Sequence, residues 1–269
     1  MRLGIIGGTG VYDPDILDDA REVTVSTPYG EVRLLAGRYR GEEVAFMNRH
    51  GAGHSLPPHR VNYRANIWAL KELGVERVIA TAAVGALRRE HAPGSLILCD
   101  QFLDFTKSRP ATFYEGGEAG VVHVDVTEPY CPELRALMEE SGRAAGLPVK
   151  NGGVYVCTEG PRFETAAEIR VFAQLGGDVV GMTGVPEVVL ARELGLCYST
   201  VAMVANLAAG LSPTPLTHSE VVAVMNQNVA HLRRLIMDTL PKIPAARERC
   251  GCAVRPEVHG RAAAGEERP

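Results

Sequence analysis

Short apolar runs alternate with segments of helical periodicity along most of the chain. Such runs are typical of buried strands, whereas apolar residues spaced three and four apart mark one face of a helix. We expect strands at Leu3–Ile6, Glu31–Ala36, Glu43–Asn48, Arg77–Thr81, Leu96–Phe105, Gly153–Cys157, Asp178–Met182 and Cys197–Ala205. We expect helices at Tyr63–Leu73, Pro132–Ala145, Ala166–Leu175, Pro186–Leu194 and Ser219–Thr239, the last opening at a capping box, Thr217–Glu220. This alternation predicts a single α/β domain over residues 1–244, with a mixed, largely parallel central sheet flanked by helices.

From about residue 245 the pattern dissolves, and residues 245–269 are expected to form a flexible C-terminal tail. The 269 residues are 46% hydrophobic, enough for one domain with a full core. A net charge of −4 gives no indication of a nucleic-acid or anionic-membrane partner. Since the chain has neither a membrane-spanning apolar stretch nor a signal-peptide pattern at its start, we expect a cytoplasmic protein.

Six cysteines are scattered along the chain. Cys99, Cys157 and Cys197 lie in apolar runs and are interpreted as small core residues. The pair Cys250 and Cys252 has no second sequence pair to complete a zinc site. We therefore expect no metal site, and we interpret the pair as part of an inert tail, with a redox-labile disulfide as the alternative.

The segment Thr158–Thr165 joins an expected strand to an expected helix. It brings the ring of Phe163 and the carboxylate of Glu164 to the end of that strand, where ligands bind in open α/β sheets. A ring and a carboxylate suit a flat heterocycle that carries N–H donors. The alternative is that Glu164 only complements the dipole at the start of the helix.

Other strand ends carry groups that suit an anion and a ring. Glycines around Thr9 allow a close backbone approach, Arg49 and His50 offer cationic donors, and Ala82 with Ala83 leaves room beside backbone N–H groups. Taken singly, these segments are also consistent with a tight turn, a surface loop and close packing.

Two further strand ends complete the set. Met182 and Thr183 end one strand, and Asn206, an amide with a donor and an acceptor edge, ends another. The alternatives are a core methionine and a turn-forming asparagine. Because these positions converge, we expect one site with an anion end and a heterocycle end.

At this point the chain resembles the trimeric purine nucleoside phosphorylase and methylthioadenosine phosphorylase family. The matching segments are Gly4–Gly10, Arg49–Gly51, Val61–Leu70, Asp100–Asp104, Glu159–Phe163, Met182–Thr183, Val185–Val189 and Ala202–Met203, and they run in order through residues 1–240. The resemblance implies the nucleoside phosphorylase fold and a reaction of purine salvage. Phosphate attacks the anomeric carbon of ribose, and the products are a free purine and a pentose 1-phosphate. Phosphate is a co-substrate, and no cofactor or metal is implied.

The resemblance also implies roles for individual residues. Phosphate would be held by Thr9, Arg49, His50, Ala82, Ala83 and Thr183; the nucleoside would contact Phe163, Met182, Asn206, Leu207 and Ala208; and Asn206 and His50 would take part in catalysis. Physical chemistry agrees, since a phosphate dianion stabilises an oxocarbenium-like transition state, and a donor near N7 stabilises the leaving purine.

The branches of this family differ in the purine and the sugar that they accept. Methylthioadenosine phosphorylases usually have Asp at positions 206 and 208 and Ser at 164, whereas this chain has Asn206, Ala208 and Glu164. Glu164 can accept from N1–H of a 6-oxopurine, so the resemblance favours the branch that acts on inosine and guanosine. His218 would meet a 5′-hydroxyl, or else only begin a helix.

His123 would reach the site of a neighbouring subunit, which implies a homotrimer or a dimer of trimers. The alternatives left open are an S-methyl-5′-thioinosine or S-methyl-5′-thioadenosine phosphorylase and, less in keeping with the intact phosphate-binding set, a regulatory protein that lost catalysis.

Overall fold

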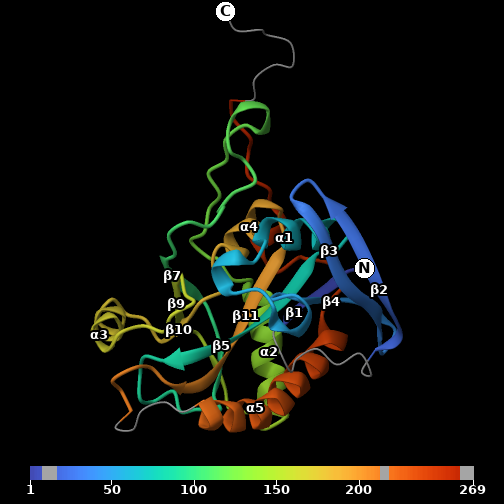
Figure 1. Ribbon diagram of the computed structural model, residues 1–269. Coiled ribbons are helices and arrows are strands. Elements are labelled where there is room, and N and C mark those ends of the chain that lie inside the picture. The colour runs from blue at the N-terminus through green and yellow to red at the C-terminus, as the bar shows by residue number, and fades with distance from the viewer. Residues whose placement is uncertain (8–16, 213–217, 261–269) are drawn as a thin grey trace, which may run out of the picture.

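The computed structural model describes residues 1–7, 17–212 and 218–260, without the side chains of residues 52 and 218–227. One large mixed sheet forms its centre (Figure 1). Its strands are β1 (Leu3–Gly7), β2 (Asp18–Thr27), β3 (Gly30–Tyr39), β4 (Glu42–Asn48), β5 (Arg77–Ala86), β6 (Leu96–Leu98), β7 (Gln101–Phe105), β8 (Val149–Asn151), β9 (Val154–Thr158), β10 (Val179–Gly181) and β11 (Cys197–Leu207). The expected fold class is confirmed.

The sheet branches at β5. One path runs in the order β2-β3-β4-β1-β5-β10-β9-β7, while β11 also pairs with β5 and leads on to β6 and β8. Strands β1, β4, β5 and β11 run parallel, so their carboxyl ends meet at one edge. β10 pairs with β5 in the antiparallel direction.

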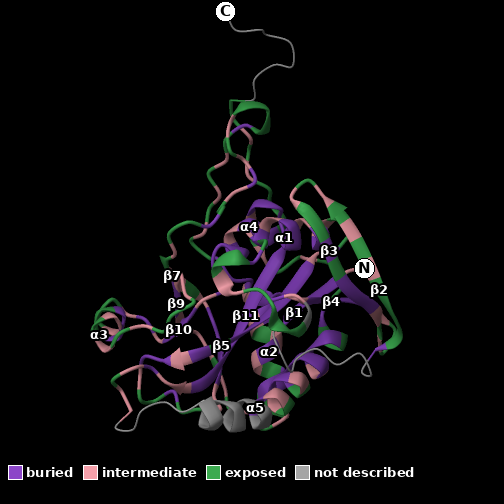
Figure 2. Ribbon diagram, viewed as in Figure 1, coloured by how far each residue is buried: buried purple, intermediate pink, exposed green. Residues whose placement is uncertain are grey.

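Two helical layers cover the sheet. The helices are α1 (Tyr63–Glu72), α2 (Pro132–Ala144), α3 (Ala166–Gln174), α4 (Glu187–Glu193) and α5 (His218–Thr239). α1 and α4 pack into one core cluster, and α2 and α5 pack into another (Figures 1 and 2). Apolar residues on both faces of the central strands explain why Ile5 and Ile6 are both fully buried.

All five expected helices are present, each within a residue or two of its predicted bounds. The strand predictions missed β2 and β8 because both edge strands are mostly polar; β2 is largely exposed, and β8 has only three residues. The single strand expected at Leu96–Phe105 is two strands, with a break at Cys99 and Asp100. β5 and β11 each continue past their expected ends.

The chain beyond residue 244 makes specific contacts with the domain. Arg77 donates to the Ala246 carbonyl, Arg247 donates to the Gly195 carbonyl at 2.8 Å, and Cys252 is buried. His259 pairs with Val121 on the arm that projects from the body (Figure 1). Residues 245–260 make these contacts although most of them are exposed, and residues 261–269 lie outside the described part, so the flexibility expected of residues 245–269 stays a prediction.

The capping box expected at Thr217 lies partly outside the described residues. In the described part of the chain, no helix combines the length and apolar character needed to cross a membrane.

Candidate active site

The predicted site residues gather at the edge where the central parallel strands end. Along β11, Met203 pairs with Ala83 of β5, and Asn206 pairs with Gly85 after a register shift. On the other side of β5, Val180 of β10 pairs with Gly85. Because β10 is antiparallel to β5, the chain leaves β10 at Gly181, beside Val84 of β5, and Met182 and Thr183 follow directly.

The strand expected to end at Thr81 continues as β5 through Ala86. Ala82 is buried there, whereas Ala83 is exposed. On one side β11 pairs with this stretch, while on the other side β1 pairs only as far as Ala80 and β10 only with Gly85 and Ala86. Among the described strands, the backbone edge of residues 81–84 therefore has no strand partner on that side and is available to a ligand. The role predicted for these two alanines, to leave room for a ligand beside backbone groups, is therefore compatible with their position in a strand.

Arg49 follows β4 and lies fully inside the protein. Its Nε and Nη2 donate to the two carboxylate oxygens of Glu187 at 2.8 and 2.7 Å, and its Nη1 donates to the Thr81 carbonyl at 2.7 Å. Burial lowers the pKa of Arg49, but the Glu187 carboxylate outweighs it and raises the pKa above its ordinary value. Arg49 is thus a fixed cation, with three of its five N–H donors in use.

Glu187 is a functional residue that the sequence reasoning missed. It is fully buried at the start of α4, and it also accepts a hydrogen bond from the Tyr198 hydroxyl at 2.6 Å. Tyr198 lies on β11, so this carboxylate connects β4, β11 and α4. The only available signal was its place within the segment Val185–Val189, which carries the family resemblance.

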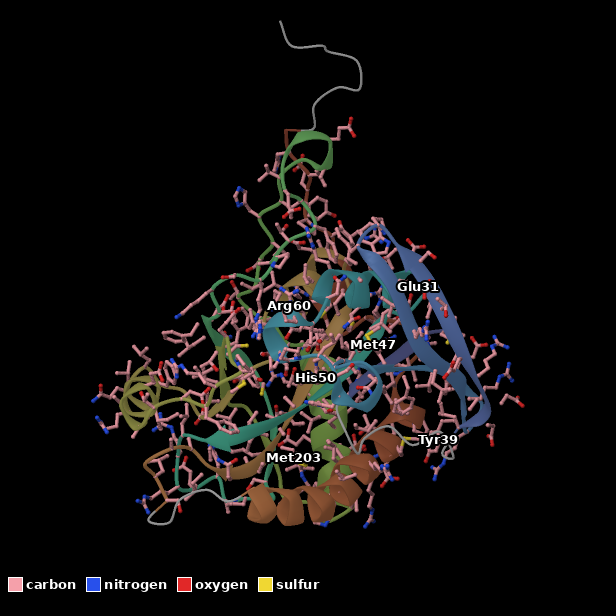
Figure 3. The ribbon with its side chains drawn as sticks, viewed as in Figure 1. Glu31, Tyr39, Met47, His50, Arg60 and Met203 are labelled. Carbon is pink, nitrogen blue, oxygen red and sulfur yellow. The ribbon has the colours of Figure 1, made fainter. Side chains whose placement is uncertain are left out.

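His50 lies next to Arg49, near the centre of the molecule in Figure 3. Its Nδ1 bonds with the Leu56 carbonyl at 2.8 Å, an acceptor, so Nδ1 carries the proton and Nε2 is an acceptor in the neutral ring. Burial lowers its pKa. The ring stacks on His54, with centroids 4.1 Å apart. His50 is therefore held neutral with a lone pair on Nε2.

Met182 and Thr183 are held by contacts beneath them. A side-chain carbon at Gly160 would lie 2.7 Å from the Met182 sulfur, so the Met182 side chain packs against the turn that precedes Glu164. The backbone N–H of Thr183 donates to the hydroxyl of the buried Tyr155 at 3.3 Å. These contacts connect β9, and the turn that follows it, to the segment that follows β10.

Glu164 is half-buried and bonded to the end of β9. The Thr158 hydroxyl donates to Glu164 Oε1 at 2.7 Å. This bond fixes the position of the carboxylate through one of its two oxygens. Thr165 caps α3 through a full capping box with Glu168, so the helix-start role suggested for Glu164 belongs to Thr165 and Glu168.

Asn206 lies where β11 shifts its register against β5. Such a bulge re-aims a side chain. Its Nδ2 donates to the Leu207 carbonyl at 2.8 Å, and Gly85 opposite leaves room for the amide. Leu207 is half-buried, whereas Ala208 is buried and packs with α3. The same helix follows Glu164, so the two predicted base-reading residues belong to adjoining segments.

Arg109 is a second residue that the sequence reasoning missed. It is buried and donates to the carbonyls of Thr158, Glu159 and Val185 at 3.1, 2.8 and 2.7 Å. It also donates to Tyr63 Oη at 3.1 Å. This one side chain therefore links the end of β9 and the residue after it to the segment that leads into α4. Nothing in its local sequence pattern marks it.

A cleft of about 500 Å³ opens beside Glu164. Its walls include Phe105, Lys107, Thr158, Arg162 and Phe172, but not Met182, Thr183 or Asn206. Glu164 also lines this cleft, so the cleft adjoins the strand-end site without including those three residues. We place the chemistry at the strand ends because the polar groups converge there.

The described part of the structure does not show four of the predicted residues at this site. Phe163 is 81% exposed, and His123 is exposed on the projecting arm. Thr9 lies outside the described residues, and the side chain of His218, the first residue of α5, is likewise outside them.

This fold and these strand ends define a class of protein. Residues 2–241 match the model of the phosphorylase superfamily, and the chain belongs to this family.

Individual relatives narrow the comparison. The chain is 59% identical over 252 residues to a "Probable 6-oxopurine nucleoside phosphorylase" of Dictyoglomus turgidum, covering 94% of this chain and 95% of that protein. It is 58% identical over 256 residues to the 6-oxopurine nucleoside phosphorylase of Pyrococcus furiosus, covering 93% and 96%. A crystal structure of a methylthioadenosine phosphorylase from an antarctic soil metagenomic library superposes with a TM-score of 0.87 at 34% identity, covering 93% and 89%.

Proposed function

We propose that this protein catalyses the reversible phosphorolysis of 6-oxopurine nucleosides, inosine and guanosine, to the free base and ribose 1-phosphate. The observation that carries the proposal is the pair of base-reading groups. Glu164 is oriented by Thr158, and Asn206 is re-aimed by a strand bulge in an adjoining segment. Both relatives with 58–59% identity are named for this substrate class.

The base would be read by complementary hydrogen bonds. Asn206 keeps a second N–H and its carbonyl for the 6-oxo group and N7, while the free oxygen of Glu164 accepts from N1–H or a 2-amino group. Adenine has an unprotonated N1, which would face that carboxylate oxygen without a donor between them. Leaving a buried polar group unpaired makes such discrimination large.

The phosphate end would work by charge placement. Arg49 is a fixed cation close to the backbone of β5, and Thr183 adds a hydroxyl. The neutral His50 offers Nε2 as an acceptor for the remaining P–OH of bound HPO₄²⁻, which orients the dianion without moving its proton. A dianion next to the anomeric carbon stabilises the oxocarbenium-like transition state as the purine leaves. In this proposal phosphate is a co-substrate, and the reaction requires no cofactor.

Oligomerisation is part of the proposal. His123 is exposed on an arm that leaves the body after Phe113 and is pinned at Val121 by a two-way backbone pairing with His259, at 2.8 and 2.9 Å. We infer that this arm reaches the 5′ end of a neighbouring site in a homotrimer or a dimer of trimers. Sedimentation equilibrium distinguishes these assemblies from a monomer, and a monomeric active enzyme would contradict the inference.

The deciding experiment compares inosine, guanosine, adenosine, methylthioadenosine and methylthioinosine with and without phosphate. We expect base release from inosine and guanosine only with phosphate. Release of hypoxanthine without phosphate would contradict phosphorolysis. A preference for methylthioinosine would support the proposed selectivity for 6-oxopurines and contradict the proposed 5′-hydroxyl sugar. A preference for methylthioadenosine would contradict the roles proposed for Glu164 and Asn206.

A further inference from the structure

Four cysteines that are far apart in the sequence meet in space. Cys131 immediately precedes α2, Cys197 is the first residue of β11, and Cys250 and Cys252 flank a glycine at the short turn Gly251–Ala253. Their four sulfur atoms all lie within 4.8 Å of one another. The expectation that Cys250 and Cys252 lack a second pair is therefore wrong, because the fold supplies that pair from two distant elements.

The spacing of the sulfur atoms suits one ion at their centre. The Sγ atoms of Cys197 and Cys250 are 3.5 Å apart, and Cys131 contacts both Cys197 and Cys252. Four Zn–S bonds of about 2.3 Å in a tetrahedron place the sulfurs about 3.8 Å apart. Three of the four residues are buried and Cys250 is partly so, which matches a closed structural site.

The surroundings provide positive charge for a thiolate cluster. Arg77 is the neighbour of Cys197 across the β5–β11 pairing, and it is 1% exposed. Among the described residues, its Nε and Nη1 have no hydrogen-bond partner. Arg192 lies within electrostatic range of Cys252, and its Nε is likewise buried without a described partner. Two carboxylates oppose them. Glu133 lies 4.0 Å from Cys250 Sγ and 3.7 Å from Arg77 Nη2, and Glu76 lies 3.7 Å from Arg77 Nη1.

We propose that Cys131, Cys197, Cys250 and Cys252 bind a single thiophilic divalent cation, of which Zn²⁺ is the representative, in a tetrahedral structural site. Binding releases the four thiol protons to solvent, leaving a ZnS₄ unit of net charge −2 with no change in oxidation state. Tetrahedral sulfur ligation is the arrangement that selects zinc or iron.

The site is separate from the catalytic one. Neighbouring residues of a strand point to opposite faces of the sheet. Cys197 belongs to the core cluster of α2 and α5, whereas Tyr198, which bonds Glu187, belongs to the cluster of α1 and α4. Asn206 lies at the far end of β11. The ion would instead fasten the C-terminal segment, whose His259 pairs with the arm that carries His123.

The test is metal content of the full chain, expressed with added Zn²⁺ and purified with a phosphine reductant and no chelator. We expect about one Zn²⁺ per chain by inductively coupled plasma mass spectrometry. Cys250→Ser combined with Cys252→Ser should lower this at least tenfold. The matched control is Cys99→Ser, which changes a buried cysteine outside the cluster and should retain the metal.

Two measurements keep the proposal falsifiable if the double variant folds poorly. Wild-type protein loaded with Co²⁺ should show thiolate-to-cobalt charge transfer and the intense visible bands of tetrahedral coordination. Wild-type protein purified without reductant, denatured with a chelator and alkylated should label all six cysteines. A metal-free wild type that gives no such cobalt spectrum would overturn the proposal, and so would labelling of only two cysteines, which would show that the cluster forms two disulfides.

Discussion

Arg49 and Glu187 form a bidentate ion pair that is completely enclosed by the protein, with Nε···Oε2 at 2.8 Å and Nη2···Oε1 at 2.7 Å. The pair places a fixed positive charge at the end of β4, and the Glu187 carboxylate offsets the desolvation penalty of that charge inside the core. A buried charge that loses its partner is strongly destabilising, because the remaining ion has neither water nor a counter-charge. Glu187 therefore supports the phosphate end of the site without needing to touch a ligand.

The first prediction concerns the stability that this pair provides. Glu187→Gln keeps the side chain's shape but removes its charge, leaving the Arg49 guanidinium uncompensated. We expect the free energy of unfolding to fall by about 3–5 kcal/mol. Urea denaturation at one fixed protein concentration measures this change.

The matched control is Glu42→Gln. Glu42 accepts from Arg2 at 2.9 Å, but its side chain is 38% exposed, so solvent screens the pair. Its loss should cost less than about 1 kcal/mol. If the two variants lose similar amounts, the buried pair does not hold the charge as we describe.

The second prediction concerns the hydrogen bond that orients Glu164. Thr158→Val preserves shape and removes the hydroxyl donor. A hydrogen bond to a charged group contributes about 1.5–3 kcal/mol, so kcat/KM for inosine should fall about 10- to 100-fold. The KM for phosphate should change much less, since Glu164 reads the base.

Thr158→Ser retains a hydroxyl and should restore most of the activity. Thr24→Val, on the exposed face of β2, serves as the control for a general effect of replacing threonine by valine. A rise in the KM for phosphate as large as the fall in kcat/KM for inosine would show that Thr158 acts through the fold rather than through Glu164. A lack of rescue by serine would show the same.

The third prediction is a pH dependence of stability. Burial lowers the pKa of His50 below its ordinary value of 6.5, and the Leu56 carbonyl only partly opposes this shift. Between the two pKa values the unfolded chain binds more protons than the folded one, so the free energy of unfolding rises with pH there. The contribution of His50 is complete above 6.5 and is lost as pH falls through the lower, folded pKa.

Denaturation at a series of pH values from neutral into the acid range tests this. His50→Gln should flatten the slope below neutrality relative to wild type. His59→Gln, at an exposed position, is the control and should keep the wild-type slope. An unchanged slope in His50→Gln would mean that the ring is not desolvated as described.

Much of the fold was predictable because the central strands are apolar on both faces and the helices carry regular apolar stripes. The edge strand β2 was not, because its largely exposed, polar residues owe their conformation to pairing with β3. The continuation of β5 through Ala86 was missed for a related reason. Small residues in Thr81–Ala86 resemble a turn until the partners on both sides are known.

The site could be predicted only where a residue's type matches its role. Asn206, Glu164 and Arg49 could be proposed from the sequence because polar groups at strand ends are unusual. Glu187 and Arg109 could not, since each acts through partners that are distant in the sequence. The cysteine cluster shows the same limit: Cys131 and Cys197 meet Cys250 and Cys252 only in the folded chain.

The last prediction tests which purine the site reads. Asn206→Asp replaces the amide donor by a carboxylate, so a 6-oxo group would face an oxygen instead of an N–H. We expect kcat/KM for inosine to fall by about 100-fold or more, because an unpaired buried polar group is left in the complex. A protonated aspartate could donate to N7 and its other oxygen could accept from a 6-amino group, so the inosine-to-adenosine ratio of kcat/KM should fall. Glu164→Gln separates the contributions, since it offers adenine N1 a donor while keeping Asn206. If neither variant moves the ratio, selectivity for 6-oxopurines arises elsewhere than in these two residues.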